Sequence, residues 1–142
     1  MEIAGRKALV LGAGRSGVAS SKFLAERGAL VALHDQKAVE EWNNAASSLK
    51  SSHNVGLIGG DLPSWLLDQI DLVVISPGVP TNTIPARYVD RKDGEVIGEV
   101  ELAYRFMKGR IVGITGSNGK TTTTTLIGEL LKDAGLKTQV GG

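Results

Sequence analysis

The chain has 142 residues, and its 16 Lys and Arg residues nearly balance its 15 Asp and Glu residues. A net charge of +1 offers no basic field that could hold a nucleic-acid backbone. The absence of cysteine excludes disulfides, thiolate zinc sites and thiol nucleophiles. The longest apolar run, Ala29–Leu33, is far too short to span a membrane, and the first residues lack a signal-peptide pattern. We therefore expect a cytoplasmic protein without membrane or nucleic-acid partners. We also expect a monomer.

Segments typical of strands and of helices alternate along the whole chain. The first helix contains Ala19, Phe23 and Leu24 at helical spacing and is capped by Gly28. The predicted strands are Lys7–Leu11, Leu30–His34, Val55–Ile58, Asp71–Ile75, Glu95–Ile97, Arg110–Thr115 and Lys137–Val140. The later predicted helices are Val39–Leu49, Ile84–Arg91, Glu99–Lys108 and the apolar stripe Leu126–Ala134. This alternation predicts an α/β fold in which crossover helices connect parallel strands.

The order of these elements suggests two parts of unequal size. Residues 1–97 hold enough strands and helices for a compact, Rossmann-like parallel-sheet domain. Residues 98–142 are too few to cover a parallel sheet on both faces. We expect them to form the beginning of a P-loop ATPase domain.

A glycine motif, GAGRSG, lies directly between the first predicted strand and the first predicted helix. Its glycines, Gly12, Gly14 and Gly17, follow the G-x-G-x-x-G pattern of dinucleotide-binding turns. Such a turn brings backbone amides and a helix N-terminus close to phosphate, and Asp35 ends the next strand, where an acid usually meets a ribose. The motif indicates a nucleotide diphosphate without identifying the nucleotide. An NAD-dependent oxidoreductase therefore remains an alternative, as does a glycine-rich turn that binds nothing.

A second glycine motif, TGSNGKTT, occupies residues 115–122. It departs from the strict Walker pattern because the preceding glycine is Gly113, one position too early. The required groups are nevertheless present: exposed amides, the ammonium of Lys120 for the β- and γ-phosphates, and the hydroxyl of Thr121 for Mg²⁺. A dehydrogenase does not need a second phosphate-binding loop, so this motif argues against an NAD-dependent oxidoreductase.

Together, the two motifs resemble those of the Mur ligases of peptidoglycan synthesis. The resemblance extends over GAGRSG, Asp35, SPGVP at 76–80, GEVELA at 98–103, TGSNGKTT and the final VGG. It implies a first domain that holds the UDP end of the substrate, a central domain that holds ATP, and a last domain that brings the amino acid. The SPGVP turn favours the branch that adds D-glutamate to UDP-N-acetylmuramoyl-L-alanine.

The resemblance also implies residue roles. Gly14, Arg15 and Ser16 would meet the UDP diphosphate, Asp35 and Gln36 would border the uracil, and Gly78 would let the substrate pass close to the backbone. Gln36 departs from the small hydroxyl residue expected there. The ATP phosphates would be wrapped by Gly116, Ser117, Asn118, Gly119, Lys120, Thr121 and Thr122, with Lys120 as the catalytic residue and Thr121 as the Mg²⁺ ligand.

The implied reaction is ATP-driven amide formation through an acyl phosphate, which the amine of D-glutamate then attacks. The remaining catalytic groups of the family would lie beyond Gly142, so we expect the 142-residue chain alone to be inactive. A module that binds a UDP-sugar without catalysis is the alternative.

Two histidines, two tryptophans and two glutamates lie outside the two glycine motifs, and we expect none of them to have a catalytic or binding role. We expect His34 and His53 to be structural or exposed, Trp42 and Trp65 to be packing residues, and Glu99 and Glu101 to be solvated helix acids.

Overall fold

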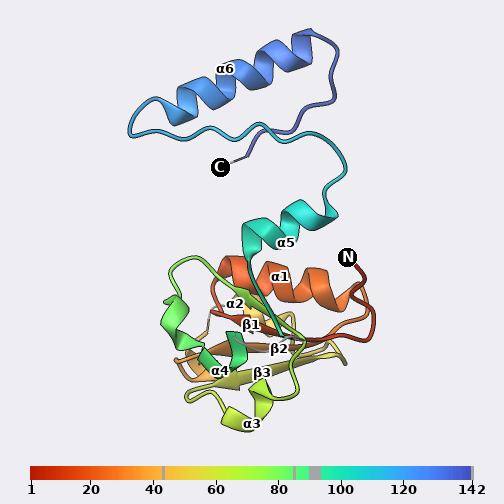
Figure 1. Cartoon of the computed structure of the whole chain (residues 1–142), viewed down its shortest axis with the longest axis vertical. Coiled ribbons are helices and arrows are strands. Elements are labelled where there is room, and N and C mark those ends of the chain that lie inside the picture. The colour runs from red at the N-terminus through yellow and green to blue at the C-terminus, as the bar shows by residue number, and fades with distance from the viewer. Residues whose placement is uncertain (43, 85, 90–93, 142) are drawn as a thin grey trace. The chain divides into compact units, whose positions relative to one another are not determined.

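The computed structural model describes residues 1–42, 44–84, 86–89 and 94–141, and Figure 1 traces the whole chain. The chain divides into two compact units, Met1–Met107 and Lys108–Gly142.

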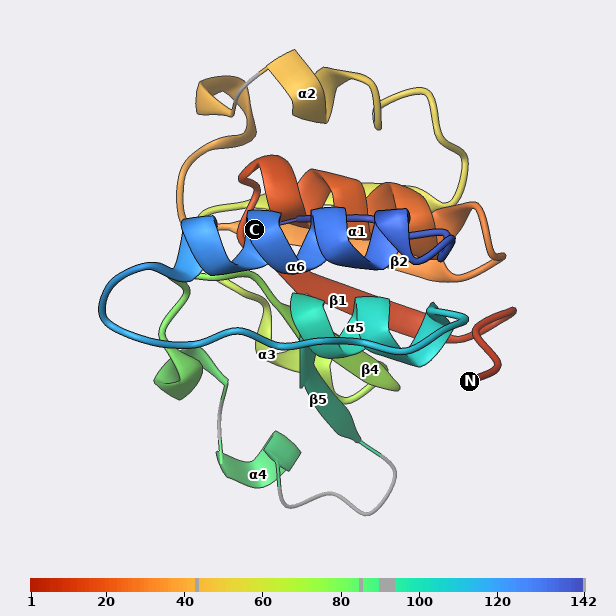
Figure 2. The same cartoon turned by 90° about the horizontal axis from the view of Figure 1, so that it is seen from above.

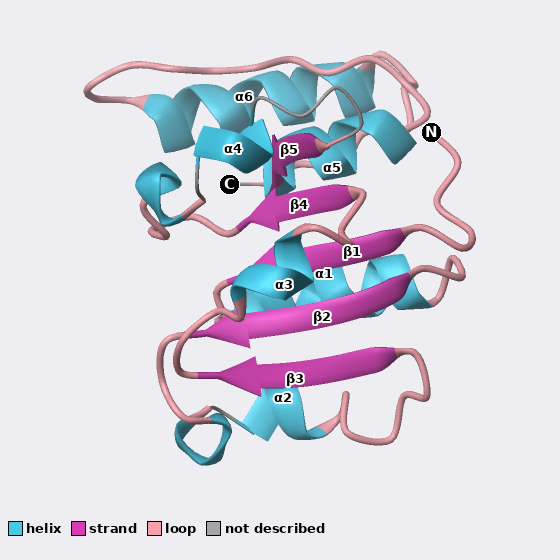
Figure 3. Cartoon of the chain, turned by 60° about the horizontal axis from the view of Figure 1, so that its bottom comes forward, coloured by secondary structure: helices cyan, strands magenta, loops and turns pink. Residues whose placement is uncertain are grey.

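The first unit is built on one parallel sheet, which confirms the predicted α/β fold with parallel strands. Its strands are β1 (Lys7–Leu11), β2 (Leu30–Asp35), β3 (Val55–Gly59), β4 (Leu72–Ile75) and β5 (Glu95–Gly98). They run in the order β3-β2-β1-β4-β5, as Figure 3 shows from bottom to top, and every adjacent pair is parallel. The chain therefore leaves β1 toward one edge through β2 and β3, and then returns to the other edge through β4 and β5.

Helices cover the two faces of this sheet unequally. On one face lie α1 (Arg15–Ala25), α2 (Asn44–Ser47) and α5 (Glu99–Phe106), which Figure 2 shows side by side with α1 in the middle. On the other face lie the single turns α3 (Ser64–Leu67) and α4 (Ala86–Val89). The described residues of this unit also form two 3-10 turns, η1 (Val39–Glu41) and η2 (Thr81–Thr83).

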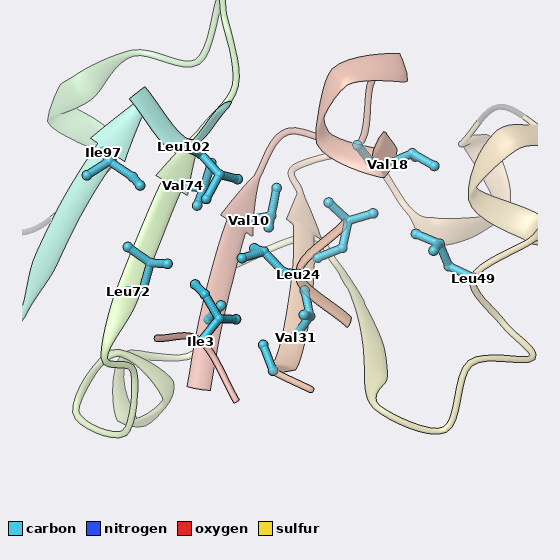
Figure 4. Close-up of a cluster of buried hydrophobic side chains, with 14 of the residues drawn as sticks. Ile3, Val10, Val18, Leu24, Val31, Leu49, Leu72, Val74, Ile97 and Leu102 are labelled. Atoms are coloured by element: carbon cyan, nitrogen blue, oxygen red, sulfur yellow. The ribbon is translucent and has the colours of Figure 1, made fainter. Parts of the chain in front are cut away.

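The strands are apolar on both faces because both faces are covered, as parallel sheets require. Two consecutive residues of β1 show this: Val10 joins the core beneath α1 and α5, whereas Leu9 joins the core beneath α3 and α4. Figure 4 shows the first of these cores, in which Leu24 of α1 and Leu102 of α5 meet the sheet. On the same face, the rings of Phe23 and Phe106 meet edge to face, with their centroids 5.1 Å apart.

The second unit contains one helix, α6 (Lys120–Asp133), and no strand among its described residues. The strands predicted at Arg110–Thr115 and Lys137–Val140 are therefore wrong for this chain. A strand needs a hydrogen-bonded neighbour, and residues 108–141 supply no partner for either segment. The apolar stripe of α6 is likewise only partly covered, since Leu126 and Leu130 are exposed.

Most predicted boundaries in the first unit agree with the structure, with a few corrections. The helix predicted over Val39–Leu49 is interrupted, because η1 and α2 replace it. Of the helix predicted over Ile84–Arg91, α4 is observed, while residues 85, 90 and 91 lie outside the described residues. The turn α3 was not predicted. Helix α5, which we expected to open the second part, packs within the first unit.

Candidate nucleotide-binding site

The carboxyl ends of β1, β2 and β4 meet at one edge of the sheet, where the chain changes direction. Strand β1 is the point of reversal, since β2 lies on one side of it and β4 on the other. In doubly wound sheets a crevice for ligands opens at this place. The three segments that leave these strands are the glycine loop at 12–17, the segment that begins at Asp35 and the SPGVP turn.

The glycines at 12 and 17 are required by close packing. Gly12 has a φ of +98°, and a Cβ there would lie 2.9 Å from Val79 Cγ2 and 3.0 Å from Ser76 Cβ. A Cβ on Gly17 would lie only 1.8 Å from the carbonyl oxygen of Gly12. The loop can thus turn tightly beneath α1 only with glycine at both positions.

Helix α1 begins at the end of this loop without a side-chain cap. Gly14 is its N-cap residue, and Arg15 and Ser16 are the first residues of the helix, both exposed. The first intrahelical bond is donated by the Val18 amide to the Gly14 carbonyl, 3.0 Å away. The amides of Arg15, Ser16 and Gly17, in the first turn, have no intrahelical acceptor, so they can donate to an anion.

Asp35 fixes the neighbouring segment through both carboxylate oxygens. Oδ2 accepts from the Ala13 amide at 2.8 Å, and Oδ1 accepts from the Lys37 amide at 3.0 Å. Partial burial alone would raise the pKa of Asp35, but these two hydrogen bonds and the charges of His34 and Lys37 outweigh it and lower the pKa. Asp35 is therefore an ionised residue that ties the glycine loop to the end of β2.

The SPGVP turn closes the site from the side of β4. Ser76 is 6% exposed, and its amide donates to the Leu11 carbonyl at 3.0 Å, which continues the β1–β4 pairing. Gly78 has a φ of +89°, a conformation that favours glycine. A Cβ at Gly78 would meet no atom within 4 Å, so the space beside it is open.

These segments surround a hollow of about 210 Å³ at the carboxyl edge. Its lining brings together three of the residues proposed to bind the UDP substrate, namely Asp35, Gln36 and Gly78. The other three, Gly14, Arg15 and Ser16, adjoin it through the glycine loop. The remaining lining residues are Leu11, Gly12, His34, Val79, Pro80 and Thr83.

A larger hollow, of about 350 Å³, lies at the opposite end of the strands. Lys7, Leu30 and Gln69 are among its lining residues, and its walls are mainly apolar. It contains no residue of either glycine motif and no helix N-terminus that could face a phosphate. The smaller hollow is therefore the candidate nucleotide site, because turn geometry and donors for an anion coincide there.

The second glycine motif forms a loop that opens α6. Gly119 is the N-cap residue, with a φ of +76°, and Gly116 has a φ of +155°. The ammonium of Lys120 folds back and donates to the Gly116 carbonyl, which places a positive charge within the loop. The chain thus supplies backbone amides, an ammonium and the Thr121 and Thr122 hydroxyls, a set of groups that fits a polyphosphate with Mg²⁺.

The threonines that follow this loop bond to their own helix. Thr124 Oγ1 donates to the Lys120 carbonyl at 2.7 Å, and Thr125 Oγ1 donates to the Thr121 carbonyl at 2.9 Å. This back-bonding satisfies hydroxyls that would otherwise compete with the helix. Among the described residues, no cluster of three or more acids or histidines forms a ready metal site.

Several of the remaining predictions are corrected by the structure. Glu99 is not simply solvated, because it accepts a hydrogen bond from Ser76. Glu101 is an exposed acid of α5, as predicted, and it pairs with Arg105. Trp65 is 59% exposed and is therefore not a packing residue. His34 is structural, as predicted: it is buried, and its Nε2 lies 2.7 Å from the Gly60 carbonyl oxygen, which can only accept a hydrogen.

Residues 6–98 match the family model described as Mur ligase MurD-like, N-terminal domain. The chain belongs to this family. It is 49% identical over 137 residues to UDP-N-acetylmuramoylalanine--D-glutamate ligase of Pelotomaculum thermopropionicum, an alignment that covers 96% of this chain and 30% of the relative. It is 46% identical over 142 residues to the ligase of the same name from Solibacter usitatus, covering 100% of this chain and 30% of that protein. This MurD-like chain therefore spans about 30% of the length of the curated relatives that it matches.

Solved structures support the same family and fold. A pseudomurein peptide ligase type C from Methanothermus fervidus aligns with a TM-score of 0.58 at 27% identity, covering 93% of this chain and 27% of that one. The precorrin-2 dehydrogenase SirC aligns with a TM-score of 0.57 at 16% identity, covering 94% of this chain and 68% of that one. The second likeness concerns the fold alone. No helix in the described part of the MurD-like chain is both long and apolar enough to cross a bilayer.

Proposed function

We propose that this chain is the N-terminal part of an ATP-dependent ligase that joins D-glutamate to UDP-N-acetylmuramoyl-L-alanine in peptidoglycan synthesis. The observation that carries the proposal is the 49% identity, over 96% of the chain, to a relative named for this reaction. The positions of the two glycine motifs support it, because each begins a helix with amides available to phosphate. Cytoplasmic location and a monomeric state stay predictions.

In this proposal, residues 1–97 bind the UDP end of the substrate. The diphosphate lies at the start of α1, where it accepts hydrogen bonds from the backbone amides of Gly14, Arg15 and Ser16 and from the Ser16 hydroxyl. The uracil occupies the hollow beside Asp35 and Gln36, and Gly78 leaves room for the rest of the substrate. Because Asp35 already accepts from Ala13 and Lys37, its main contribution is to hold the loop in shape.

The second unit, which starts at Lys108, begins the ATP-binding part. When bound, ATP with Mg²⁺ supplies the phosphoryl group that activates the substrate carboxylate as an acyl phosphate. The loop of Gly116, Ser117, Asn118 and Gly119 surrounds the phosphates with its amides. Lys120 would exchange its contact with the Gly116 carbonyl for the phosphates, where its charge would stabilise the phosphoryl group during transfer. The Thr121 hydroxyl would help to hold the metal, and Thr122 would contact the phosphates.

The proposal is tested by phosphate release that depends on D-glutamate, in the complete ligase of which this chain is the N-terminal part. Lys120→Ala should lower turnover by a factor on the order of 10² or more, because its ammonium acts during phosphoryl transfer. Lys132→Ala is the matched control, since Lys132 lies in the last turn of the same helix and pairs with Glu129 there. Residues 1–142 alone should release no phosphate.

Near-normal turnover of the Lys120→Ala ligase would show that this loop is not the ATP site. Turnover by residues 1–142 alone would show that the chemistry has been assigned to the wrong part of the protein. Activity with another amino acid in place of D-glutamate would be consistent with the proposed ATP site but would contradict the proposed amino-acid substrate.

A further inference from the structure

A short hydrogen bond joins the SPGVP turn to the start of α5. Ser76 Oγ donates to Glu99 Oε1 at 2.6 Å, a distance typical of a hydroxyl that donates to an ionised carboxylate. The Gly12 carbonyl is a poorer acceptor for the same hydrogen, since its oxygen lies 3.4 Å from Ser76 Oγ. The single hydrogen of the Ser76 hydroxyl is therefore committed to Glu99.

Ser76 lies where several parts of the glycine loop converge. Its Cβ would lie 3.0 Å from a Cβ on Gly12, and its Oγ would lie 3.0 Å from a Cβ on Gly17. Ser76 is thus packed against both of the glycines that shape the loop. The Glu99 carboxylate is separated from that loop by one hydroxyl group.

A carboxylate in this position is an unexpected neighbour for a diphosphate. Like charges that face each other at short distance repel, and a free carboxylate would also compete for the amides at the start of α1. Glu99 is however also in the first turn of α5, where the helix dipole favours a negative charge. A donor that holds the carboxylate at this helix keeps it out of the loop.

We propose that Ser76 is a positioning residue for the substrate diphosphate, and that it acts by holding the Glu99 carboxylate on α5, away from the amides of the glycine loop. This inference rests on the proposed function, because it takes the loop to be the diphosphate site. It assigns to the serine of SPGVP a part in recognising phosphate although Ser76 need not touch the substrate.

The test compares the affinities of the chain for UDP and for uridine, which share the base and ribose but differ in the phosphates. Ser76→Ala should lower the affinity for UDP on the order of tenfold and leave that for uridine nearly unchanged. Adding Glu99→Gln to Ser76→Ala should restore the affinity for UDP to within about twofold to threefold, because the competing charge is gone. Glu99→Gln alone should change the affinity by less than about twofold, since Ser76 already holds that side chain.

The control variants distinguish the effect of the Glu99 charge on affinity from the effect of a general disturbance of the fold. Ser21→Ala removes another buried serine hydroxyl, which bonds to the Gly17 carbonyl at 2.8 Å, and should not alter the ratio of the two affinities. Glu101→Gln removes a charge from the same turn of α5 and should have no selective effect on UDP. If Ser76→Ala does not fold, Ser76→Cys replaces it, because a thiol donates weakly and should give a smaller loss in the same direction.

Three results would overturn the inference. Ser76→Ala could leave the ratio of the affinities for UDP and uridine unchanged, or it could lower the affinity for UDP equally with and without Glu99→Gln. Glu99→Gln alone could also raise the affinity for UDP tenfold. Each presupposes that the unaltered chain binds UDP. If the unaltered chain does not bind UDP, the proposed function fails instead, so the two failures are distinguishable.

Discussion

The two units use the same device, a glycine-rich loop that opens a helix, but they support it differently. In the first unit, Gly12 and Gly17 are packed so closely that added Cβ atoms would lie within 3.0 Å of neighbouring atoms. In the second unit, a Cβ on Gly119 would meet nothing within 4 Å, and that glycine is required only by its φ of +76°. The conformation of such a loop can therefore be set locally, whereas its rigidity depends on the elements packed around it.

The helices that follow the loops differ in the same way. Helix α1 buries Gly17, Val18, Ser21 and Leu24 against the first unit. The buried residue of α6 is Gly128, whose added Cβ would lie 2.4 Å from Val140 Cγ2. A helix that buries so little of its apolar surface within its own unit gains little stability from packing.

The largest expected effect comes from filling the space at Gly17. Gly17→Ala should destabilise the first unit by about 3 kcal/mol or more, because the new Cβ would lie 1.8 Å from the Gly12 carbonyl oxygen and backbone must move. Gly14→Ala is the matched control in the same loop, with φ near −68° and open space around its Cβ, and should cost less than about 1 kcal/mol. Urea titration followed by circular dichroism measures both. Equal costs would mean that the loop is not fixed by packing.

The rates of amide hydrogen exchange should also differ between the two units. We expect the amides of β1 and β4, which lie inside the sheet, to exchange at least about a hundredfold more slowly than those of residues 124–133 in α6, after correction for intrinsic rates. The strands open only when the first unit unfolds, whereas α6 can open by itself. Mass spectrometry of peptides from both units provides the measurement. Comparable protection in α6 would show support that the described contacts do not account for.

A smaller effect on stability is expected from the ion pairs that connect α5 to the sheet. Hydrogen bonds from Arg105 lower the pKa of Glu95 below its usual value of 4.5, against the opposing effect of partial burial, and Arg6 lowers it further. Because the folded-state pKa is lowered, this stabilisation is present above about pH 4.5 and is lost as the pH falls through the folded-state value.

Glu95→Gln should therefore cost about 0.5 to 1 kcal/mol at pH 7, as for partly exposed ion pairs, and less at pH 3. Thermal unfolding at the two pH values measures the difference. The Glu129→Gln variant, which removes an ion pair from α6, should leave the unfolding of the first unit unchanged at both pH values. A cost for Glu95→Gln that did not diminish in acid would contradict this account of the network.

The sequence predicts most of the first unit because its signals there are local and mutually consistent. Short apolar runs predict β1, β2 and β4, and G-x-G-x-x-G predicts the turn into α1. The turn α3 was missed because its four residues are too few to show a helical period. The strand predicted at Arg110–Thr115 fails for the opposite reason: its pattern is suitable, but a strand also needs a partner that residues 108–141 do not provide.

The candidate site shows the same limit. Asp35 and Gly78 could be placed at the carboxyl edge from the order of the elements, because parallel strands end at the same edge. The contact between Ser76 and Glu99 could not be predicted, because it joins the SPGVP and GEVELA segments through side chains and no sequence pattern pairs the two residues. A serine after a strand and a glutamate in the first turn of a helix are both common.

The central claim is that the first unit recognises a uridine diphosphate rather than a dinucleotide. It is tested most directly by calorimetry of residues 1–142 with UDP-N-acetylmuramoyl-L-alanine, UDP and NAD, each titrated separately. We expect both uridine ligands to bind more tightly than NAD, and Gly17→Ala to abolish their binding by disrupting the loop. Tighter binding of NAD than of either uridine ligand would contradict the account.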